Sequence, residues 1–331
     1  MLILAGVIAL IEGPVFGAEG RIPVYQAGTL SMSGHYIVTQ SFTGTGAAPA
    51  ITVDTHDVDL DLNGFVISNG SGAPVISVYP HTRVAIRNGA VNGGSTGLLL
   101  GNSQNVVENV AVYQSFGVGI SIMSGTHHLI RNVSVDNSAG DAIYLYDTTT
   151  LVEDVKIRFA GGHGIHVYQG FGNMVANCVI EDVTLNGIYF DGTTAAAAVN
   201  NNIRGVPGEG IRMDAVNTHA RIWDNRVFST SHAIHLSGGS TASIMRNAVR
   251  SDAGHGILVQ ASHTVVEGNQ ADSCAAFGIY LTVSTQYSSY GRNALQENGG
   301  SGCTGVTYSG DFCDEGSANR SFGDNLIPTL H

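Results

Sequence analysis

Positive charge is scarce in this sequence. Its 331 residues hold 14 Lys and Arg against 26 Asp and Glu, a formal net charge of −12, and Lys156 is the only lysine. A protein that binds nucleic acid needs a basic surface, so the composition argues against a nucleic-acid partner. It is also unfavourable for a polyanionic partner unless the arginines gather locally, and six of them do fall between Arg204 and Arg250.

Long hydrophobic runs are also rare. The apolar run at residues 2–11 is too short to span a bilayer comfortably, and no other segment qualifies, so we expect no membrane span. Small residues around Gly17 and Ala18 follow this run, which is typical of a secretory signal, although a basic start is missing. We therefore predict a signal segment at residues 1–18 and a secreted or periplasmic protein. The alternative is a hydrophobic plug on the first turn of the fold.

What the sequence does contain is an internal repeat. A small residue followed by an aliphatic residue recurs nine times at intervals of 22 or 23 residues, which is typical of a solenoid. The 44 glycines and the charged fraction of 12% suit short stacked strands joined by tight corners. The nine copies are Gly97-Leu98, Gly119-Ile120, Ala142-Ile143, Gly164-Ile165, Gly187-Ile188, Gly210-Ile211, Ala233-Ile234, Gly256-Ile257 and Gly278-Ile279.

The repeat predicts β-strands. After the small residue the pattern is apolar, any, apolar, as in Ile143-Tyr144-Leu145, and this alternation turns the apolar side chains inward. A second short strand follows in each repeat with a polar corner residue, for which asparagine is well suited. We expect these corner residues to form one column that bonds from turn to turn. They are Asn109, Asn132, Asp154, Asn177, Asn202, Asn225, Asn247 and Asn269.

The period and the strands predict an all-β protein, a right-handed parallel β-helix of about ten or eleven coils. Leucine-rich repeats have a similar period, but their signature is missing, and propeller blades of the WD40 type need about 40 residues. In the predicted fold one interior column consists of Ile143, Ile165, Ile188, Ile211, Ile234 and Ile257.

Over roughly residues 19–300 the chain resembles the bacterial right-handed parallel β-helix repeat proteins, the superfamily of polysaccharide lyases and alginate C5-epimerases. The repeats carry the resemblance together with the first strands, Gly34-His35-Tyr36-Ile37-Val38, Ile51-Thr52-Val53 and residues 59–67. The group also includes hydrolases, phage tailspikes and accessory proteins. The motif of the large secreted alginate epimerases, Tyr-Gly-Phe-Asp-Pro-His, is absent. The resemblance therefore implies the fold and does not fix one activity.

The predicted organisation is a single elongated domain. Residues 1–18 are the signal segment, 19–50 an N-terminal cap, 51–298 the coils and 299–331 a C-terminal cap. Cys303 and Cys313 lie ten residues apart in the Gly-rich tail, and in an exported protein we expect them to form a disulfide. Cys178 and Cys274 are four coils apart, too far to pair, and we expect them to be small buried residues.

Residues at one offset in each repeat stack into rows on the surface, where neighbouring turns lie about 4.8 Å apart. The pattern His-small-Ile-His occurs twice, at residues 163–166 and 232–235, and three rows bring His, Tyr, Arg and carboxylates together. We predict that His166, Tyr189, Arg212 and His235 are catalytic. We predict that the substrate-binding residues are Tyr144, Tyr146, His163, Tyr168, Asp191, Glu209, Asp214 and His232.

These residue types suit a polysaccharide lyase or C5-epimerase that removes the C5 proton of a uronate-containing polymer. Arg212 would hold the carboxylate, His166 or His235 would act as base, and Tyr144 or Tyr189 would exchange the second proton. The set is similar in role to the His, Tyr and Arg sites of lyases and epimerases in the superfamily that the chain resembles.

Two other functions remain open. A glycoside hydrolase would use two carboxylates from Asp191, Asp214 and Glu209, about 5–5.5 Å apart for retention or 6.5–9.5 Å for inversion. A non-catalytic glycan-binding or scaffold protein would use the tyrosines to stack sugars, and repeat duplication alone also copies residues. We expect no cofactor and no metal; Ca²⁺ is the ion that the same three carboxylates would suit.

Overall fold

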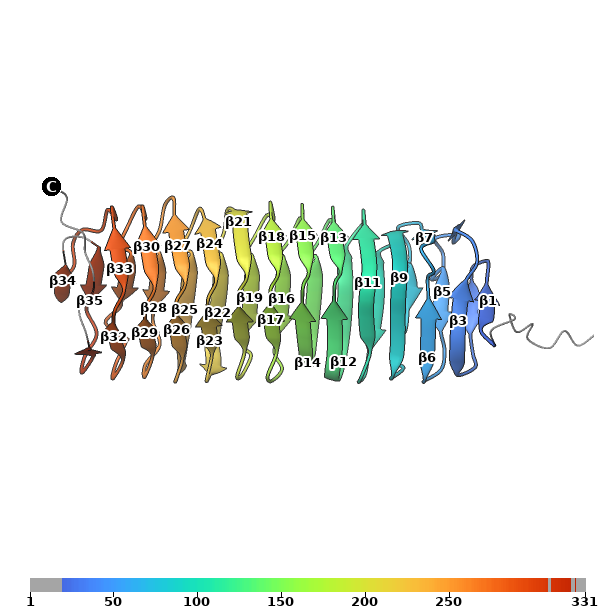
Figure 1. Cartoon of the computed structure of the whole chain (residues 1–331), viewed down its shortest axis with the longest axis horizontal. Helices are drawn as coiled ribbons and strands as arrows, with labels where there is room; N and C mark the ends of the chain where they lie inside the picture. Colours follow the sequence, from blue (N-terminus) through green and yellow to red (C-terminus); the bar gives the residue numbers. More distant parts are fainter. Residues whose placement is uncertain (1–19, 309–310, 323–324, 326–331) are drawn as a thin grey trace, which may run out of the picture.

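The computed structural model describes residues 20–308, 311–322 and 325, so the predicted signal segment lies outside the described residues. The chain winds into a parallel solenoid of about 12 turns, stacked along one long axis (Figure 1). This confirms the predicted β-solenoid. The count of ten or eleven coils was too low, because strands before the first recognisable repeat already pair with the later ones. No helix among the described residues is long and apolar enough to cross a membrane.

Each turn contributes to three parallel faces, which we call sheets 1, 2 and 3. Sheet 1 carries the repeat unit and its strands pair in register from one end to the other. Its strands are β2 (Gly28–Leu30), β5 (Ile51–Val53), β8 (Ile76–Ser77), β10 (Thr96–Gly101), β12 (Val118–Arg131), β14 (Ile143–Glu153), β16 (Ile165–Tyr168), β19 (Ile188–Asp191), β22 (Ile211–Thr218), β25 (Ile234–Ser240), β28 (Ile257–Val259), β31 (Ile279–Leu281) and β35 (Phe312–Asp314).

Sheet 2 follows sheet 1 in each turn and also takes in the later halves of β12 and β14, which bend round the corner. Its other strands are β1 (Ile22–Val24), β3 (Gly34–Val38), β6 (Val58–Asp61), β9 (Val84–Gly93), β11 (Val106–Tyr113), β17 (Met174–Ala176), β20 (Ala197–Val199), β23 (Arg221–Trp223), β26 (Ser243–Met245), β29 (Val265–Glu267), β32 (Ser289–Gly291) and β36 (Arg320–Ser321).

Sheet 3 closes the turn and shares the later halves of β9 and β11. Its other strands are β4 (Phe42–Thr43), β7 (Val66–Asn69), β13 (Ser134–Asp136), β15 (Lys156–Arg158), β18 (Val179–Glu181), β21 (Asn202–Val206), β24 (Arg226–Ser229), β27 (Ala248–Ser251), β30 (Gln270–Asp272) and β33 (Ala294–Gln296). At the C-terminal end β34 (Val306–Tyr308) pairs antiparallel with β35.

The interior is a set of apolar columns, one from each sheet. The six isoleucines predicted to stack are all 0% exposed, and each pairs directly with the next. The residue before each isoleucine is small because the neighbouring turn passes close to it. A Cβ on Gly187, for example, would lie 2.6 Å from the backbone oxygen of Gly210. The repeat unit is therefore a packing requirement of the fold.

The cysteines lie as predicted. Cys303 and Cys313 form a disulfide with a Cα–Cα distance of 5.8 Å, which ties the tail to β35. Cys178 and Cys274 are unpaired and buried, and burial raises the pKa of each thiol to about 12. Both are packing residues that stay protonated at neutral pH.

The single asparagine column that the sequence predicts is in fact two columns. An exposed one lies at corners with left-handed backbone, where the side chain of Asn132 donates to Asn109 at 2.7 Å. A buried one joins backbone and side-chain amides of successive turns at 2.9–3.1 Å, and Asn202 is not part of it. The residues of the buried column are Asn201, Asn225, Asn247, Asn269 and Asn293, each at most 2% exposed.

The two neighbours Asn201 and Asn202 test this assignment. Asn201 accepts from the backbone N–H of Cys178 and donates to the carbonyl oxygen of Val175. Replacing it by alanine leaves both groups buried without partners, so we expect Asn201→Ala to lower the free energy of unfolding by about 3 kcal/mol in urea titrations. Asn202→Ala, on the outward side of β21, should change it by less than about 0.5 kcal/mol. Equal losses in the two variants would contradict the buried column.

Candidate functional site

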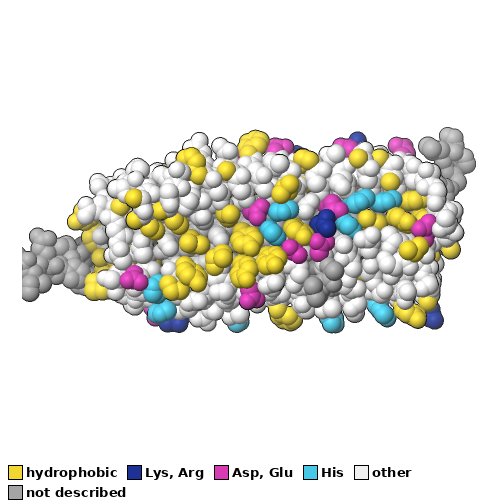
Figure 2. Space-filling model, turned by 180° about the vertical axis from the view of Figure 1, so that it is seen from behind, with side chains coloured by type: hydrophobic (Ala, Val, Ile, Leu, Met, Phe, Trp, Pro, Cys, Tyr) yellow, Lys and Arg dark blue, Asp and Glu magenta, His cyan; other side chains and the backbone are white. Residues whose placement is uncertain are grey.

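The predicted site residues lie together on the outer surface of sheet 1, over β14 to β25. Tyr144, His166, Tyr189, Arg212 and His235 are direct neighbours on successive strands. Figure 2 shows histidine, acidic and basic side chains gathered in one band along the middle of this face, next to hydrophobic side chains. We call this band, with its flanking rows, the strip. The order along it follows directly from the 22- or 23-residue period.

His166 is oriented by Asp141, the residue just before the repeat unit that leads into β14. One carboxylate oxygen of Asp141 accepts the backbone N–H of His163 at 2.7 Å, and the other lies 3.2 Å from Nδ1 of His166. A carboxylate on Nδ1 holds the proton there and leaves the lone pair on Nε2. Within the described residues Nε2 of His166 is buried and has no hydrogen-bond partner. The pair therefore presents an unengaged basic nitrogen.

Aromatic rings from the turns before and after pack against His166. Its ring stacks on Tyr189 with a centroid distance of 4.9 Å and an interplanar angle of 16°, and it meets Tyr144 edge-on at 5.2 Å. Burial is the main cause that raises the pKa of both tyrosines, so each hydroxyl stays protonated at neutral pH. Next to them Tyr146 stacks on Tyr168 at 5.7 Å. Tyr146 is 37% exposed, which leaves an aromatic surface for a sugar ring.

Arg212 lies between two carboxylates. Its Nε donates to Asp214 at 2.9 Å and one terminal nitrogen lies 3.3 Å from Glu209. Asp214 also accepts the hydroxyl of Tyr189 at 2.7 Å, and the guanidinium lies over the ring of Tyr189 at 5.5 Å. The arginine is thus fixed in position beside the tyrosine. The Arg212 side chain remains 35% exposed, so part of the guanidinium is accessible at the surface of this network.

His235 is held differently from His166. Its Nδ1 lies 2.5 Å from Glu209 and its Nε2 lies 3.0 Å from the side-chain oxygen of Gln260, and the residue is 9% exposed. Both ring nitrogens are therefore engaged. Glu209 is itself 7% exposed and connects His235 to Arg212. The arrangement is a buried ion-pair network that fixes Arg212.

His163 and His232 belong to a row that links the turns. Nδ1 of His163 accepts the backbone N–H of Asn186 at 3.1 Å, and Nδ1 of His232 accepts that of His255 at 2.9 Å. His255 in turn accepts the backbone N–H of Phe277. Burial lowers the pKa of all three rings, to about 4 for His255. His163 and His232 are predicted from the sequence to bind substrate, and this contact with the backbone of the next turn was not predicted.

One group of possible metal ligands lies in the strip, and its hydrogen bonds limit the lone pairs that it offers. Donor atoms of Asp141, His163 and His166 lie within 4.8 Å of one another. However, Nδ1 of His163 already accepts a backbone N–H, so its Nε2 carries the proton, and Nδ1 of His166 faces Asp141. One nitrogen lone pair and one carboxylate remain, too few for a metal centre. Of the three carboxylates that would suit Ca²⁺, Glu209 and Asp214 contact Arg212, whereas Asp191 makes no ion pair within the described part of the chain.

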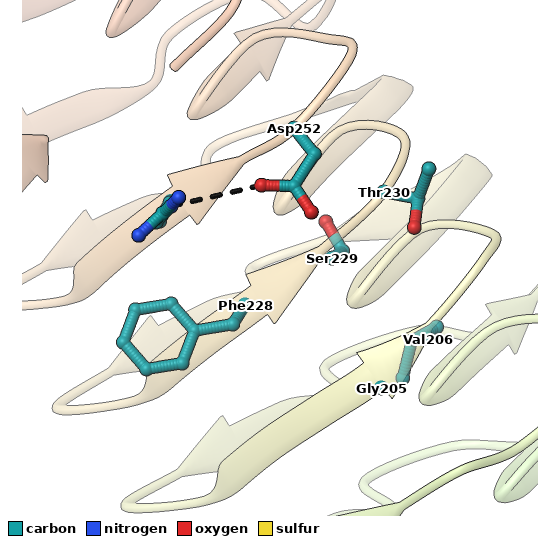
Figure 3. Close-up of a pocket in the computed structure, with 7 residues that line it drawn as sticks. Gly205, Val206, Phe228, Ser229, Thr230 and Asp252 are labelled. Atoms are coloured by element: carbon teal, nitrogen blue, oxygen red, sulfur yellow. Dashed lines mark ion pairs between the residues drawn. The ribbon is translucent and has the colours of Figure 1, made fainter. Parts of the chain in front are cut away.

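Two side chains that contact the candidate histidines, Asp141 and Gln260, are not among the residues predicted from the sequence. Asp141 and His163 both lie two residues before an isoleucine of the repeat, so the position of Asp141 in this row of residues could have indicated that it lies next to the site. Gln260 follows β28 at the offset of Asp214 and gave no signal, because an isolated glutamine on a solenoid surface is common. The hollow lined by Phe228, Ser229 and Arg250 lies elsewhere, on sheet 3 (Figure 3).

Comparison with known proteins defines the class. The family described as "Right handed beta helix region" matches residues 120–260 and 186–311, which together cover more than half of the chain. The protein therefore belongs to the right-handed β-helix family. By sequence it matches no curated protein significantly.

Solved structures agree with the fold. A double mutant of the periplasmic alginate epimerase AlgG is similar with a TM-score of 0.62 and 16% identity, over 83% of this chain and 77% of that one. The mannuronan C-5 epimerase AlgE4 A-module of Azotobacter vinelandii gives 0.59 and 12%, over 90% and 89%. The Dettilon tailspike protein gives 0.57 and 14%, over 87% and 63%. At these identities the likeness shows the fold alone.

The histidine row makes stability depend on pH. The folded pKa of His255 is about 4, below the ordinary value of about 6.5, so between these values the unfolded chain binds more protons. Stability from this group is complete above pH 6.5 and is lost as the pH falls toward 4. His255→Asn keeps an acceptor for Phe277, as Asn186 does for Glu209, and removes the titration. We expect its melting temperature to fall less than that of the wild type between pH 7 and 4.5. An identical fall in both proteins would contradict the buried neutral ring.

Proposed function

We propose that the strip is the active site of an enzyme that removes the C5 proton from a uronate-containing polysaccharide, as a lyase or a C5-epimerase. The observation that carries the proposal is the Asp141–His166 pair with Nε2 unengaged. A general base needs a lone pair, a fixed tautomer and a position next to the reacting atom. Of the two candidate bases, His166 has the free lone pair and the fixed tautomer, whereas both ring nitrogens of His235 are hydrogen-bonded.

The neighbouring residues supply the rest of the reaction. Nε2 of His166 takes the C5 proton and the electron pair passes into the sugar carboxylate, where the charge must be stabilised. The exposed part of the Arg212 guanidinium donates to this carboxylate. Tyr189 remains protonated and lies against His166, so it delivers a proton. It protonates the leaving oxygen at C4 in a lyase, or C5 from the opposite face in an epimerase.

Access and binding follow from the surroundings. Nε2 of His166 is shielded from solvent, so substrate reaches it when one of the adjacent rings rotates. The exposed Tyr146–Tyr168 stack lies beside the base and supports a neighbouring sugar of the polymer. A chain lying along the strip would cross successive strands about 4.8 Å apart. A polymeric substrate also fits an exported protein. Two observations support export: the Cys303–Cys313 disulfide and the likeness to a periplasmic alginate epimerase.

A glycoside hydrolase is the second candidate, because one observation favours it. Asp191 lies at the end of β19 without an ion pair in the described structure, while Glu209 is buried and Asp214 is half-buried nearby. Four carboxylates and one arginine leave the strip negatively charged, which suits a neutral glycan better than a polyuronate. The products separate these functions. Ultraviolet absorbance of an unsaturated sugar marks a lyase, altered NMR signals without cleavage mark an epimerase, and new reducing ends alone mark a hydrolase.

His166→Gln tests the base directly. Loss of a general base typically lowers turnover by about 10²- to 10⁴-fold, so we expect kcat on a polyuronate to fall by that amount while the polymer still binds. His127→Gln, an exposed corner histidine, is the control and should retain full activity. Asp141→Asn should also lower kcat, because an amide no longer holds the proton on Nδ1. A His166→Gln enzyme with wild-type turnover would place the base elsewhere.

Arg212 tests recognition of the sugar carboxylate. Loss of a charged contact in the transition state costs about 2–3 kcal/mol, so Arg212→Ala should lower kcat/KM by roughly 30- to 150-fold. Arg212→Lys keeps the charge but loses the planar guanidinium, so its activity should lie between that of Arg212→Ala and that of the wild type. Arg320→Ala removes an exposed arginine near the C-terminal end and serves as the control. If Arg212→Ala were as active as Arg320→Ala, Arg212 would not contact the substrate.

A further inference from the structure

Positive charge gathers on a second surface, the outer side of sheet 3 between β15 and β27. Five of the 14 Lys and Arg lie there, on strands that pair in sequence. The four steps from β15 to β27 span about 19 Å at the usual strand spacing. We call this the basic surface; its residues are Lys156, Arg158, Arg204, Arg226 and Arg250.

Much of this charge is not neutralised. Arg204 contacts Glu181 at 2.6 Å and Arg250 lies 3.6 Å from Asp252. Lys156, Arg158 and Arg226 make no ion pair with any described residue. On the side of sheet 2 most arginines are paired: Arg87 and Arg131 both contact Glu108, and Arg246 and Arg292 contact Asp224 and Glu267, whereas Arg221 and Arg320 make no ion pair with a described residue. A protein with a net charge of −12 thus concentrates unpaired cations on one face.

Aromatic rings hold two of these guanidinium groups in place. The central guanidinium carbon of Arg158 lies 4.9 Å from the ring centre of Phe159, and that of Arg226 lies 5.1 Å from that of Phe228. Stacking fixes the plane of the guanidinium and leaves its N–H edges available for an anion. Phe159 is 46% exposed, so its ring is also accessible.

A hollow adjoins this surface. Figure 3 shows the ring of Phe228, the hydroxyls of Ser229 and Thr230 and the carboxylate of Asp252 around it; Arg250, which lies 3.6 Å from Asp252, also lines it. Gly205 contributes no side chain, which helps to keep the hollow open. An aromatic ring, a hydroxyl and a guanidinium are groups that bind a sugar: the ring packs on the sugar face, and Thr230 and Arg250 bond its oxygens, while the hydroxyl of Ser229 already donates to the carbonyl oxygen of Ser231.

We propose that the basic surface is a second, non-catalytic binding site for a polyuronate strand. The sugar carboxylates pair with Lys156, Arg158 and Arg226, and one sugar lies in the hollow against Phe228. The occupant is a polyanion because the face offers unpaired cations in a chain that is otherwise acidic. Sheet 3 is a different face from the strip on sheet 1, so the surface retains a long polymer near the strip without entering the reaction. The proposal shares with the proposed function only the class of substrate.

The test is a triple variant, Lys156→Ala with Arg158→Ala and Arg226→Ala, in the full chain. Binding of polymannuronate, measured by isothermal titration calorimetry, should weaken by about tenfold or more. Turnover of an oligouronate too short to reach both faces should not change. The control triple Arg221→Ala, Arg246→Ala and Arg292→Ala changes the net charge equally on the side of sheet 2, and should bind polymannuronate as the wild type does.

Equal weakening in both triple variants would show that bulk charge alone attracts the polymer and would overturn the proposal. Unchanged binding in the first variant would do the same. Dextran should not bind to the basic surface; if it competes with polymannuronate there, the site does not recognise an anion. If the wild type turned over no polyuronate but the first triple variant still lost binding, the proposed reaction would fail and the basic surface would stand. If the wild type turned over a polyuronate and the first triple variant bound polymannuronate as tightly as the wild type, the proposed reaction would stand and the basic surface would fail.

Discussion

In-register pairing of each turn with the next is the constraint on which the rest of the structure depends. Because every coil repeats the same path, a residue at one offset lies about 4.8 Å from its counterpart in the neighbouring coil. Interior isoleucines are thereby stacked without exposure, and buried asparagines bond their successors through both backbone and side chain. The same register places unlike side chains next to one another on the outside, which is how His166, Tyr189 and Arg212 meet.

The surface rows carry two kinds of interaction that are easily confused. The three histidines that lie two residues before an isoleucine, His163, His232 and His255, are part of the fold: they accept backbone N–H groups from the next turn, and burial lowers their pKa. Asp141 accepts such an N–H too, but its second oxygen orients His166. Glu209 interrupts the row, because its carboxylate bonds to His235 and Arg212 instead. The candidate site therefore lies where a structural row changes its partners.

Most of the fold could be predicted because it follows from periodicity. The isoleucine column, the order of neighbours along the strip and the Cys303–Cys313 bond depend on spacing alone. The number of turns could not, because the first strands lack the repeat unit. Asn201 and Asn202 could not be told apart either, since adjacent asparagines both match a polar corner. Nor could the sequence rank His166 above His235, because that ranking depends on where Asp141, Glu209 and Gln260 point.

The central claim is that the strip removes a proton from C5 through His166. Release of deuterium to water from polymannuronate labelled at C5 measures this step in both a lyase and an epimerase. If His166 is the base, the wild-type protein releases deuterium from C5. Substitution of His166 should slow this release while the polymer still binds. Cleavage of the labelled polymer with no release of deuterium from C5 would contradict it.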